Sequence, residues 1–255
     1  MTCLSYAALT LWLQGYPDQA RERSHEALTL SEALAHPFTR MWAAHWAGQL
    51  HGHGFLQENQ QVQEQVEKVR TLETEHGFTQ FSAQTTMRQG WVLLTQGHVV
   101  EGMAQLREGL EASRAKGLEM NLPSLLARLA QAYHLQGQVE EGLTVLAEAL
   151  ALVDKNDERW WEAELHRLKG ELLQQQAVPD VSQAETCFQQ ALAVARHQQA
   201  KSLELRAAMS LSRLWQRQGK RTEAHQLLAE IYGWFTEGFD TADLREAKAL
   251  LAELA

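Results

Sequence analysis

The chain of 255 residues carries a formal net charge of -9, is 45% hydrophobic and contains only 4 prolines. This composition is typical of a folded helical protein and argues against disorder. The negative charge argues against nucleic acid as a partner, because proteins that bind it neutralise phosphates with a basic surface. We find no apolar run of membrane-spanning length and no secretory signal, and therefore expect a cytoplasmic protein without a membrane partner.

A glycine turn followed five positions later by a small residue recurs along the chain. The pattern occurs as Gln14-Gly15 before Ala20, Gln96-Gly97 before Gly102, Gln136-Gly137 before Gly142 and Gln218-Gly219 before Ala224. Gly54 and Ala177 stand at the corresponding places of two further units, so the turns repeat about every 40 residues. Apolar residues at helical spacing flank each turn. The sequence therefore predicts six antiparallel helix pairs.

We expect a single repeat domain over residues 1–255. Its units span approximately 1–37, 38–77, 78–119, 120–157, 158–200 and 201–238, and a capping helix follows at 241–254. The second unit departs most from the pattern, and the fifth carries an insertion at 178–181. The first unit begins almost at Met1 and leaves its outer face uncovered, which suggests a homo-oligomer through the N-terminal repeat.

Glycine has two different tasks in this pattern. At each turn it ends the first helix, because it adopts a positive φ at little cost. Inside a helix it costs about 1 kcal/mol relative to alanine. Gly90 and Gly170, each seven residues before a turn, therefore indicate close packing of the paired helices.

These spacings resemble the tetratricopeptide repeat (TPR), which has a small residue seven positions before the glycine turn and alanines after it. The first unit matches with Ala8, Gly15, Ala20 and Ala27. The resemblance implies an all-α, right-handed superhelical solenoid. The period is longer than the standard repeat of about 34 residues, by enough for one or two extra helical turns.

Longer motifs in the C-terminal part carry a second resemblance. They are RWWEAELHR at 159–167, AKSLELR at 200–206 and YGWFTEGFDT at 232–241. These segments are similar to the end of large bacterial signalling proteins, in which a nucleotide cyclase or another output domain and a STAND-type regulatory ATPase precede such repeats. The resemblance implies a non-catalytic regulatory tail, with an upstream ATPase or cyclase domain as a partner.

No catalytic, cofactor or metal site is predicted. The chain has no phosphate-binding loop of the G-x-x-x-x-G-K-[ST] type, and the HGHG segment at 51–54 is too short for a nucleotide fingerprint. His45, His51 and His53 do not share a helical face well, so metal binding is not expected. Paired carboxylates such as Glu140 and Glu141 are typical of solvated helix surfaces. We expect a protein that is not an enzyme.

The TPR resemblance implies a concave groove lined by the first helix of each pair, and the ligand-facing positions of the family define a candidate partner-binding face. Its first half is apolar and aromatic and comprises Leu9, Trp12, His51, Met87, Trp91 and Leu94. Its second half is polar and comprises Gln131, His134, Arg167, Glu171, Arg206, Arg213 and Arg217. Clustered arginines suit carboxylates or phosphates on a peptide. The apolar half suits equally well a further superhelical layer or another copy.

Two functions follow from this face. The leading hypothesis is a protein-interaction module that binds a peptide, a partner domain or its own upstream ATPase. The alternative is a sensor domain whose groove closes on a small molecule or a signalling peptide. A compact site ringed by Trp12, Trp91 and His134 favours sensing, whereas an open channel over several units favours protein binding.

Overall fold

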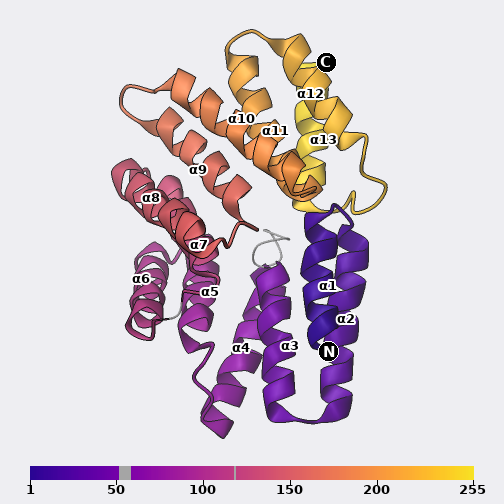
Figure 1. The fold of residues 1–255 in the computed structure, drawn as a ribbon, viewed down its shortest axis with the longest axis vertical. Helices are drawn as coiled ribbons and strands as arrows, with labels where there is room; N and C mark the ends of the chain where they lie inside the picture. Colours follow the sequence, from indigo (N-terminus) through magenta and orange to yellow (C-terminus); the bar gives the residue numbers. More distant parts are fainter. Residues whose placement is uncertain (52–58, 118) are drawn as a thin grey trace. The chain divides into compact units, whose positions relative to one another are not determined.

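A computed structural model describes residues 1–51, 59–117 and 119–255, and in these ranges every regular element is a helix (Figure 1). In chain order the helices are α1 (Thr2–Leu13), α2 (Pro17–Leu34), α3 (Pro37–Gln49), α4 (Asn59–His76), α5 (Ser82–Thr95), α6 (Val99–Ala115), α7 (Leu122–Leu135), α8 (Val139–Asn156), α9 (Glu162–Gln175), α10 (Val181–His197), α11 (Lys201–Arg217), α12 (Arg221–Tyr232) and α13 (Ala242–Leu254). The predicted all-α fold is confirmed. None of these helices is long and apolar enough to cross a bilayer.

The helices group into two compact units, which are described separately. The first contains residues 1–12 and 16–118, and the second contains 13–15 and 119–255. In the first unit, α2 to α6 pack in succession. In the second, each helix from α7 to α13 packs against the next, and α7, α9, α11 and α13 also contact one another in that order. The division of the chain into six repeats of one domain stays a prediction.

The predicted glycine turns are present where the structure describes them. Gly97 has a φ of 91° and Gly219 a φ of 81°, and both lie directly after the first helix of a pair. A residue with a Cβ would be strained in this left-handed conformation. Gly54, the turn glycine expected in the second unit, lies outside the described residues, as does His53.

The predicted close packing of glycines inside helices is confirmed. A Cβ placed on Gly90 would lie 2.7 Å from the carbonyl oxygen of Gly102, and a Cβ on Gly102 would lie 2.7 Å from that of Gly90. The backbones of α5 and α6 therefore touch. In the second unit, a Cβ on Gly170 would lie 2.5 Å from Cε1 of Phe188. There the glycine makes room for a ring rather than for a backbone.

The insertion expected in the fifth repeat is also present. Five residues, 176–180, connect α9 to α10, whereas three, 218–220, connect α11 to α12. Asp180 ends the longer connection, and its Oδ1 accepts a hydrogen bond of 2.8 Å from the backbone N–H of Gln183. This N-cap satisfies one of the free donors at the start of α10.

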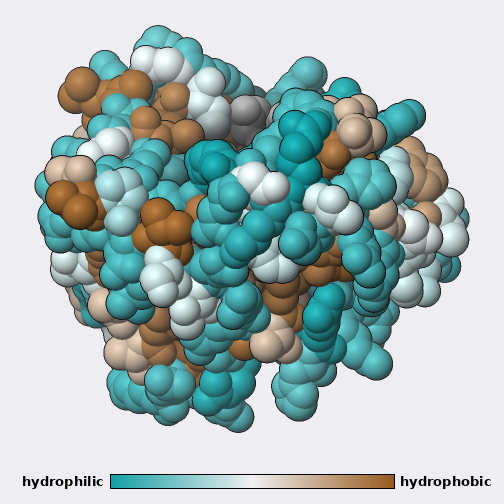
Figure 2. All heavy atoms as spheres, turned by 90° about the horizontal axis from the view of Figure 1, so that it is seen from above, coloured by the Kyte–Doolittle hydropathy of each residue, from teal (hydrophilic) through white to brown (hydrophobic). Residues whose placement is uncertain are grey.

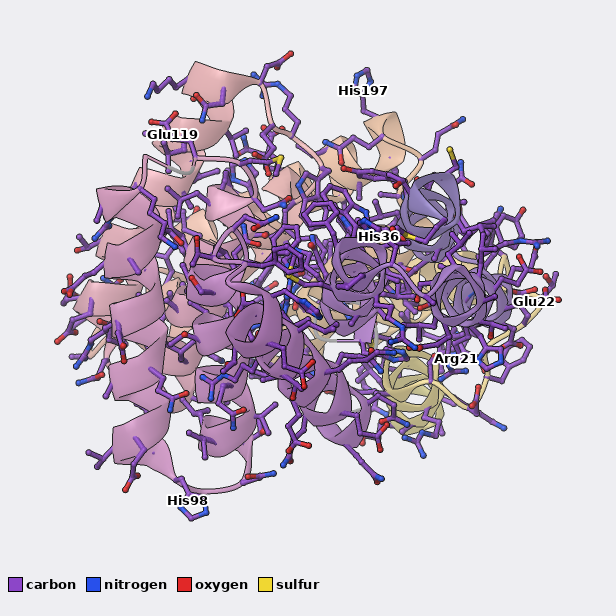
Figure 3. The ribbon with its side chains drawn as sticks, turned by 90° about the horizontal axis from the view of Figure 1, so that it is seen from below. Arg21, Glu22, His36, His98, Glu119 and His197 are labelled. Atoms are coloured by element: carbon purple, nitrogen blue, oxygen red, sulfur yellow. The ribbon has the colours of Figure 1, made fainter. Side chains whose placement is uncertain are left out.

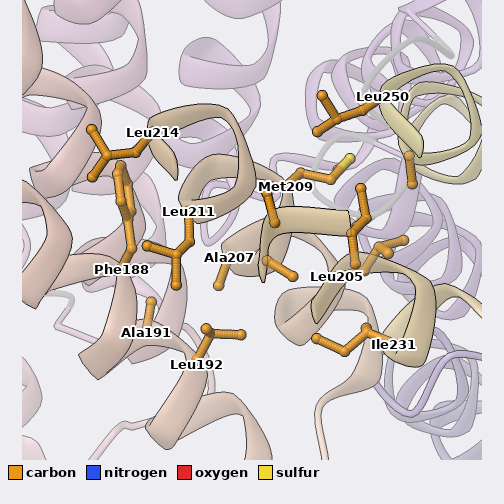
Figure 4. Packing of buried hydrophobic residues seen from close by; sticks show 14 of the residues in the cluster. Phe188, Ala191, Leu192, Leu205, Ala207, Met209, Leu211, Leu214, Ile231 and Leu250 are labelled. Atoms are coloured by element: carbon orange, nitrogen blue, oxygen red, sulfur yellow. The ribbon is translucent and has the colours of Figure 1, made fainter. Parts of the chain in front are cut away.

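A continuous apolar core joins α10, α11, α12 and α13 (Figure 4). Phe188 and Leu205 are almost completely buried in it. Leu244 and Leu250 bury the apolar face of α13 against the same core, as expected of a capping helix. Each fully buried leucine stabilises the fold by about 1.5–3 kcal/mol relative to an exposed one.

The face of the molecule shown in Figure 2 is largely hydrophilic, with apolar side chains in small separated groups. Among the described residues, Val100 and Val178 are the most exposed large apolar side chains. Single exposed apolar residues are usual on folded proteins and mark no binding site by themselves.

Candidate functional site

Charged and polar side chains collect on α7, α9, α11 and α13 of the second unit. The set comprises Arg128, Gln131 and His134 of α7, Glu164, Arg167, Glu171 and Gln174 of α9, Arg206, Ser210, Arg213 and Arg217 of α11, and Asp243 and Glu246 of α13. We call this set the charged row. α7, α9, α11 and α13 contact one another in succession, and side chains of the row bridge α9 to α11 and α11 to α13.

Arg167 lies at the middle of the charged row. Its Nε and Nη2 each donate a hydrogen bond of 2.8 Å to the Glu164 carboxylate. Its Nη1 donates to Glu171 at 3.3 Å and to Ser210 at 3.2 Å, and the Ser210 hydroxyl donates to Glu171 at 2.6 Å. Since Ser210 belongs to α11, this network fastens α9 to α11.

Burial and charge oppose each other at this pair. The side chain of Arg167 is 14% exposed and that of Glu164 is 4% exposed. Burial disfavours both charges, but the opposite charge outweighs it and stabilises each ionised form. The Glu164 carboxylate raises the pKa of Arg167, and Arg167, assisted by Arg206 and Arg128, lowers the pKa of Glu164. Both groups are therefore charged at neutral pH.

A second buried pair fastens α11 to α13. Arg206 is 4% exposed, and its Nε donates to Oδ2 of Asp243 at 2.8 Å. Burial raises the pKa of Asp243 even though Arg206 acts in the opposite direction. This ion pair stabilises the position of the terminal helix beside the leucines described above.

The outer members of the charged row are more accessible. Arg213 forms an ion pair with Glu246, and their side chains are 37% and 51% exposed. Arg217 is exposed and donates to the side-chain oxygen of Gln174. His134 is partly buried, and burial lowers its pKa below its usual value of 6.5, so this imidazole is neutral at pH 7.

The two halves of the predicted partner-binding face differ in their exposure and surroundings. Gln131, His134, Arg167, Glu171, Arg206, Arg213 and Arg217 all lie in the charged row. In the first unit, Trp12, Met87, Trp91 and Leu94 are buried, and only Leu9 and His51 are partly exposed. The buried side chains fill contacts between helices and offer little surface to a partner. Arg167 and Arg206, expected to bind carboxylates of a partner, are instead held by carboxylates of this chain.

The pattern of the repeats does not select one further arginine, Arg88 of α5. Its Nη1 lies 3.1 Å from Nδ1 of His45 on α3, and its Nη2 lies 3.5 Å from Nε2 of the same ring. The ring of Phe81 stacks on His45 with a centroid distance of 3.8 Å. A signal for this site does exist in the sequence, because Arg88 is the single charged residue between 82 and 95.

Metal-binding arrangements are not found in the part of the chain that the structure describes. No group of three His, Cys, Asp or Glu side chains there is placed to hold a metal ion. Figure 3 shows Glu22 projecting from α2 and His98 from the turn between α5 and α6, away from the packed helices. Cys187 is buried and Cys3 is exposed, and both thiols are free.

Comparison with curated proteins gives one distant relative. No family model matches this chain. An uncharacterized protein of Rhizobium meliloti (strain 1021) is 24% identical over 212 residues, which cover 83% of this chain and 20% of that protein. The chain thus spans a fifth of the length of this relative.

Several solved structures resemble this chain over nearly its whole length. A Rap protein complexed with competence and sporulation factor has a TM-score of 0.65 at 13% identity, with 99% of this chain and 70% of that chain covered. Yeast Tom70 has a TM-score of 0.59 at 13% identity, with 98% and 53% covered. A STAND protein with a tetratricopeptide repeat sensor from Pyrococcus horikoshii has a TM-score of 0.56 at 15% identity, with 98% and 38% covered. The chain has the tetratricopeptide-repeat fold. Its helix pairs resemble the repeat array of that STAND protein.

Proposed function

We propose that this TPR chain is a non-catalytic interaction scaffold that binds a protein or peptide along the charged row, as the regulatory part of a larger bacterial signalling protein. The observation that carries the proposal is the charged row itself, a line of charged and polar side chains across α7, α9, α11 and α13 with ion pairs on the last three of these helices. The similarity to a STAND protein with a TPR sensor supports the regulatory role. An upstream ATPase or cyclase domain is the partner that we propose first.

The outer part of the charged row is the part that a partner would contact. An exposed ion pair such as Arg213–Glu246 contributes only about 0–1 kcal/mol to stability. A carboxylate of a partner can therefore replace Glu246 beside Arg213 at little cost. The buried Arg167–Glu164 pair cannot be exchanged in this way, because separating it leaves an uncompensated charge in the interior.

The partner surface would carry charges of both signs. Arg213 and Arg217 offer donors for carboxylates. Glu246, once released, and the partly exposed Glu171 accept from lysine or arginine of a partner. A partner segment in which acidic and basic residues alternate would be complementary to the order of charges along the row. The homo-oligomer expected through the first repeat stays a prediction.

The double variant Arg213→Glu with Arg217→Glu tests this proposal. Binding is measured by titration calorimetry against the ATPase or cyclase domain encoded upstream. We expect the affinity to fall at least about tenfold, which corresponds to the loss of about 1.4 kcal/mol or more. The control carries the same charge change at Arg221→Glu with Lys248→Glu, outside the charged row. Equal affinities of the two folded variants would show that the row does not bind this partner.

A further inference from the structure

Arg88 differs from Arg167, Arg206 and Arg213 of the charged row, each of which forms an ion pair with a carboxylate. Its hydrogen-bonding contacts in the described part of the chain are those with His45. A neutral imidazole has one acceptor nitrogen, so it can satisfy only one of the five N–H donors of a guanidinium. Neither α3 nor α5 contains an aspartate or a glutamate. The charge of Arg88 is therefore not neutralised within these two helices.

The surroundings make this charge unusual. Burial lowers the pKa of Arg88 to about 10, and it lowers the pKa of His45 well below its usual value, with the charge of Arg88 acting in the same direction. At neutral pH, Arg88 is therefore charged and His45 is neutral. A charge withdrawn from water without a counter-charge is unfavourable, and proteins normally pair such groups. Arg88 nevertheless remains partly exposed.

Several buried polar atoms on α3 and α5 also have no hydrogen-bond partner in the described structure. They are Nε2 and Oε1 of Gln49, Oε1 of Gln84, Oγ1 of Thr85 and the indole nitrogens of Trp42 and Trp46. Gln49 and Thr85 are each 1% exposed, and Gln84 is 5% exposed. Buried polar groups in folded proteins are almost always satisfied. The orphaned donors and acceptors on these two helices are therefore groups that a ligand could satisfy.

Helical periodicity brings these groups together. Trp42, His45 and Gln49 follow one another at three and four residues on α3 and share one face of that helix. Gln84 and Arg88 are four residues apart on α5 and share a face there. The contact between Arg88 and His45 shows that the two faces meet.

Aromatic rings line the same place. Phe81 stacks on His45, and the rings of Trp42 and Phe81 meet edge to face with centroids 5.5 Å apart. Phe38 packs against Trp42 at 6.1 Å. A ligand that reaches the guanidinium would thus have apolar rings beside its uncharged part.

We propose that Arg88 and its neighbours on α3 and α5 bind a small organic monocarboxylate with an apolar or aromatic body. The guanidinium would hold the carboxylate with two parallel hydrogen bonds. The free amide of Gln49 and the indole N–H of Trp46 supply further donors, and Phe81 and Trp42 contact the body. A single positive charge suits a monoanion better than a phosphate dianion. This site lies in the first unit and does not depend on the scaffold role of the charged row.

Benzoate and its neutral isostere benzamide test the proposal with the whole chain. We expect saturable binding of benzoate by calorimetry, a rise in melting temperature on its addition, and at least tenfold weaker binding of benzamide. Arg88→Gln should weaken benzoate binding at least tenfold. The control Arg70→Gln removes an exposed arginine of α4 in the same unit and should leave binding unchanged. Absence of saturable benzoate binding, or equal binding to wild type and Arg88→Gln, overturns the proposal.

Two additional measurements make these results unambiguous. Arg88→Gln removes a charge without a counter-charge, so its melting temperature without ligand should equal or exceed that of wild type. A loss of binding then cannot be attributed to unfolding, whereas a clear fall in melting temperature would contradict the absence of a partner for Arg88. The dipeptide acetyl-Ala-Phe, with a free or an amidated C-terminus, identifies the source of the carboxylate. Tighter binding of the free acid than of benzoate would replace the small molecule with a peptide terminus.

Discussion

Arg88 in the first unit and Arg167 in the second occupy similar positions on their helices but differ in the charge of their neighbours. Each lies within one turn of a helix glycine, Gly90 or Gly170, that permits close packing. Arg167 has two glutamates and a serine as partners, whereas Arg88 has a neutral histidine. The difference shows that Glu164 and Glu171 make Arg167 part of the scaffold, whereas α3 and α5 carry no acid and leave Arg88 to the anion that we propose.

The largest expected effect concerns the buried pair of the second unit. Glu164→Gln leaves Arg167 without its two-point partner in the interior, and we expect the free energy of unfolding to fall by about 3 kcal/mol. Urea denaturation followed by circular dichroism measures the change. The control Glu246→Gln removes the acid of the exposed Arg213 pair and should cost less than about 1 kcal/mol. Similar losses in both variants would abolish the distinction between buried and exchangeable pairs.

The next largest effect is expected for glycine-to-alanine substitutions at close helix contacts, which differ between the two units. Gly102→Ala in the first unit places a Cβ 2.7 Å from a backbone oxygen of α5, which cannot move aside alone, and we expect a loss of about 2–3 kcal/mol. Gly142→Ala in the second unit meets the methyl groups of Leu172, which can rotate away. The gain of about 1 kcal/mol from alanine in a helix offsets much of that cost. If thermal unfolding ranks Gly142→Ala as the more destabilising variant, a backbone contact does not tolerate a Cβ less well than a side-chain contact does.

The smallest effect is the pH dependence of the stability of the first unit. His45 has a folded-state pKa well below that of the unfolded chain, so the unfolded state takes up a proton first as the pH falls below about 6.5. Its contribution to stability is therefore complete at neutral pH and declines toward pH 5, by about 1–2 kcal/mol. Urea midpoints at pH 7 and pH 5 measure it. His45→Gln should remove this part of the decline, and His98→Gln, at an exposed turn, should leave it intact.

Much of the fold could be predicted from the sequence because glycine reports on the backbone directly. The left-handed turn at Gly97 and the backbone contact at Gly90 each follow from the absence of a Cβ. The capping helix followed from its period of buried leucines, such as Leu244 and Leu250. Each of these features depends on residues close together in the chain or on one repeating rule.

The candidate site was less accessible, because pairing depends on residues far apart in the chain. Ligand-facing family positions led to Arg206 but could not show that Asp243, on a helix outside the six pairs, holds it. The same positions led to Met87 and Trp91, whose side chains fill helix contacts. Arg88 lies between Met87 and Trp91 in the sequence but is not one of the ligand-facing family positions. The absence of acids from 37–49 and 82–95 was visible in the sequence, yet its meaning required knowing that these two segments face each other.

The backbone contact between Gly90 and Gly102 has a consequence for recognition. Arg88 lies half a turn before Gly90, on a helix whose main chain is pressed against that of α6. Side chains can repack, but two touching backbones have almost no freedom to slide. The guanidinium therefore projects from a rigid base, and an anion that binds it need not order the helix in doing so. Preorganisation of this kind lowers the entropic cost of association.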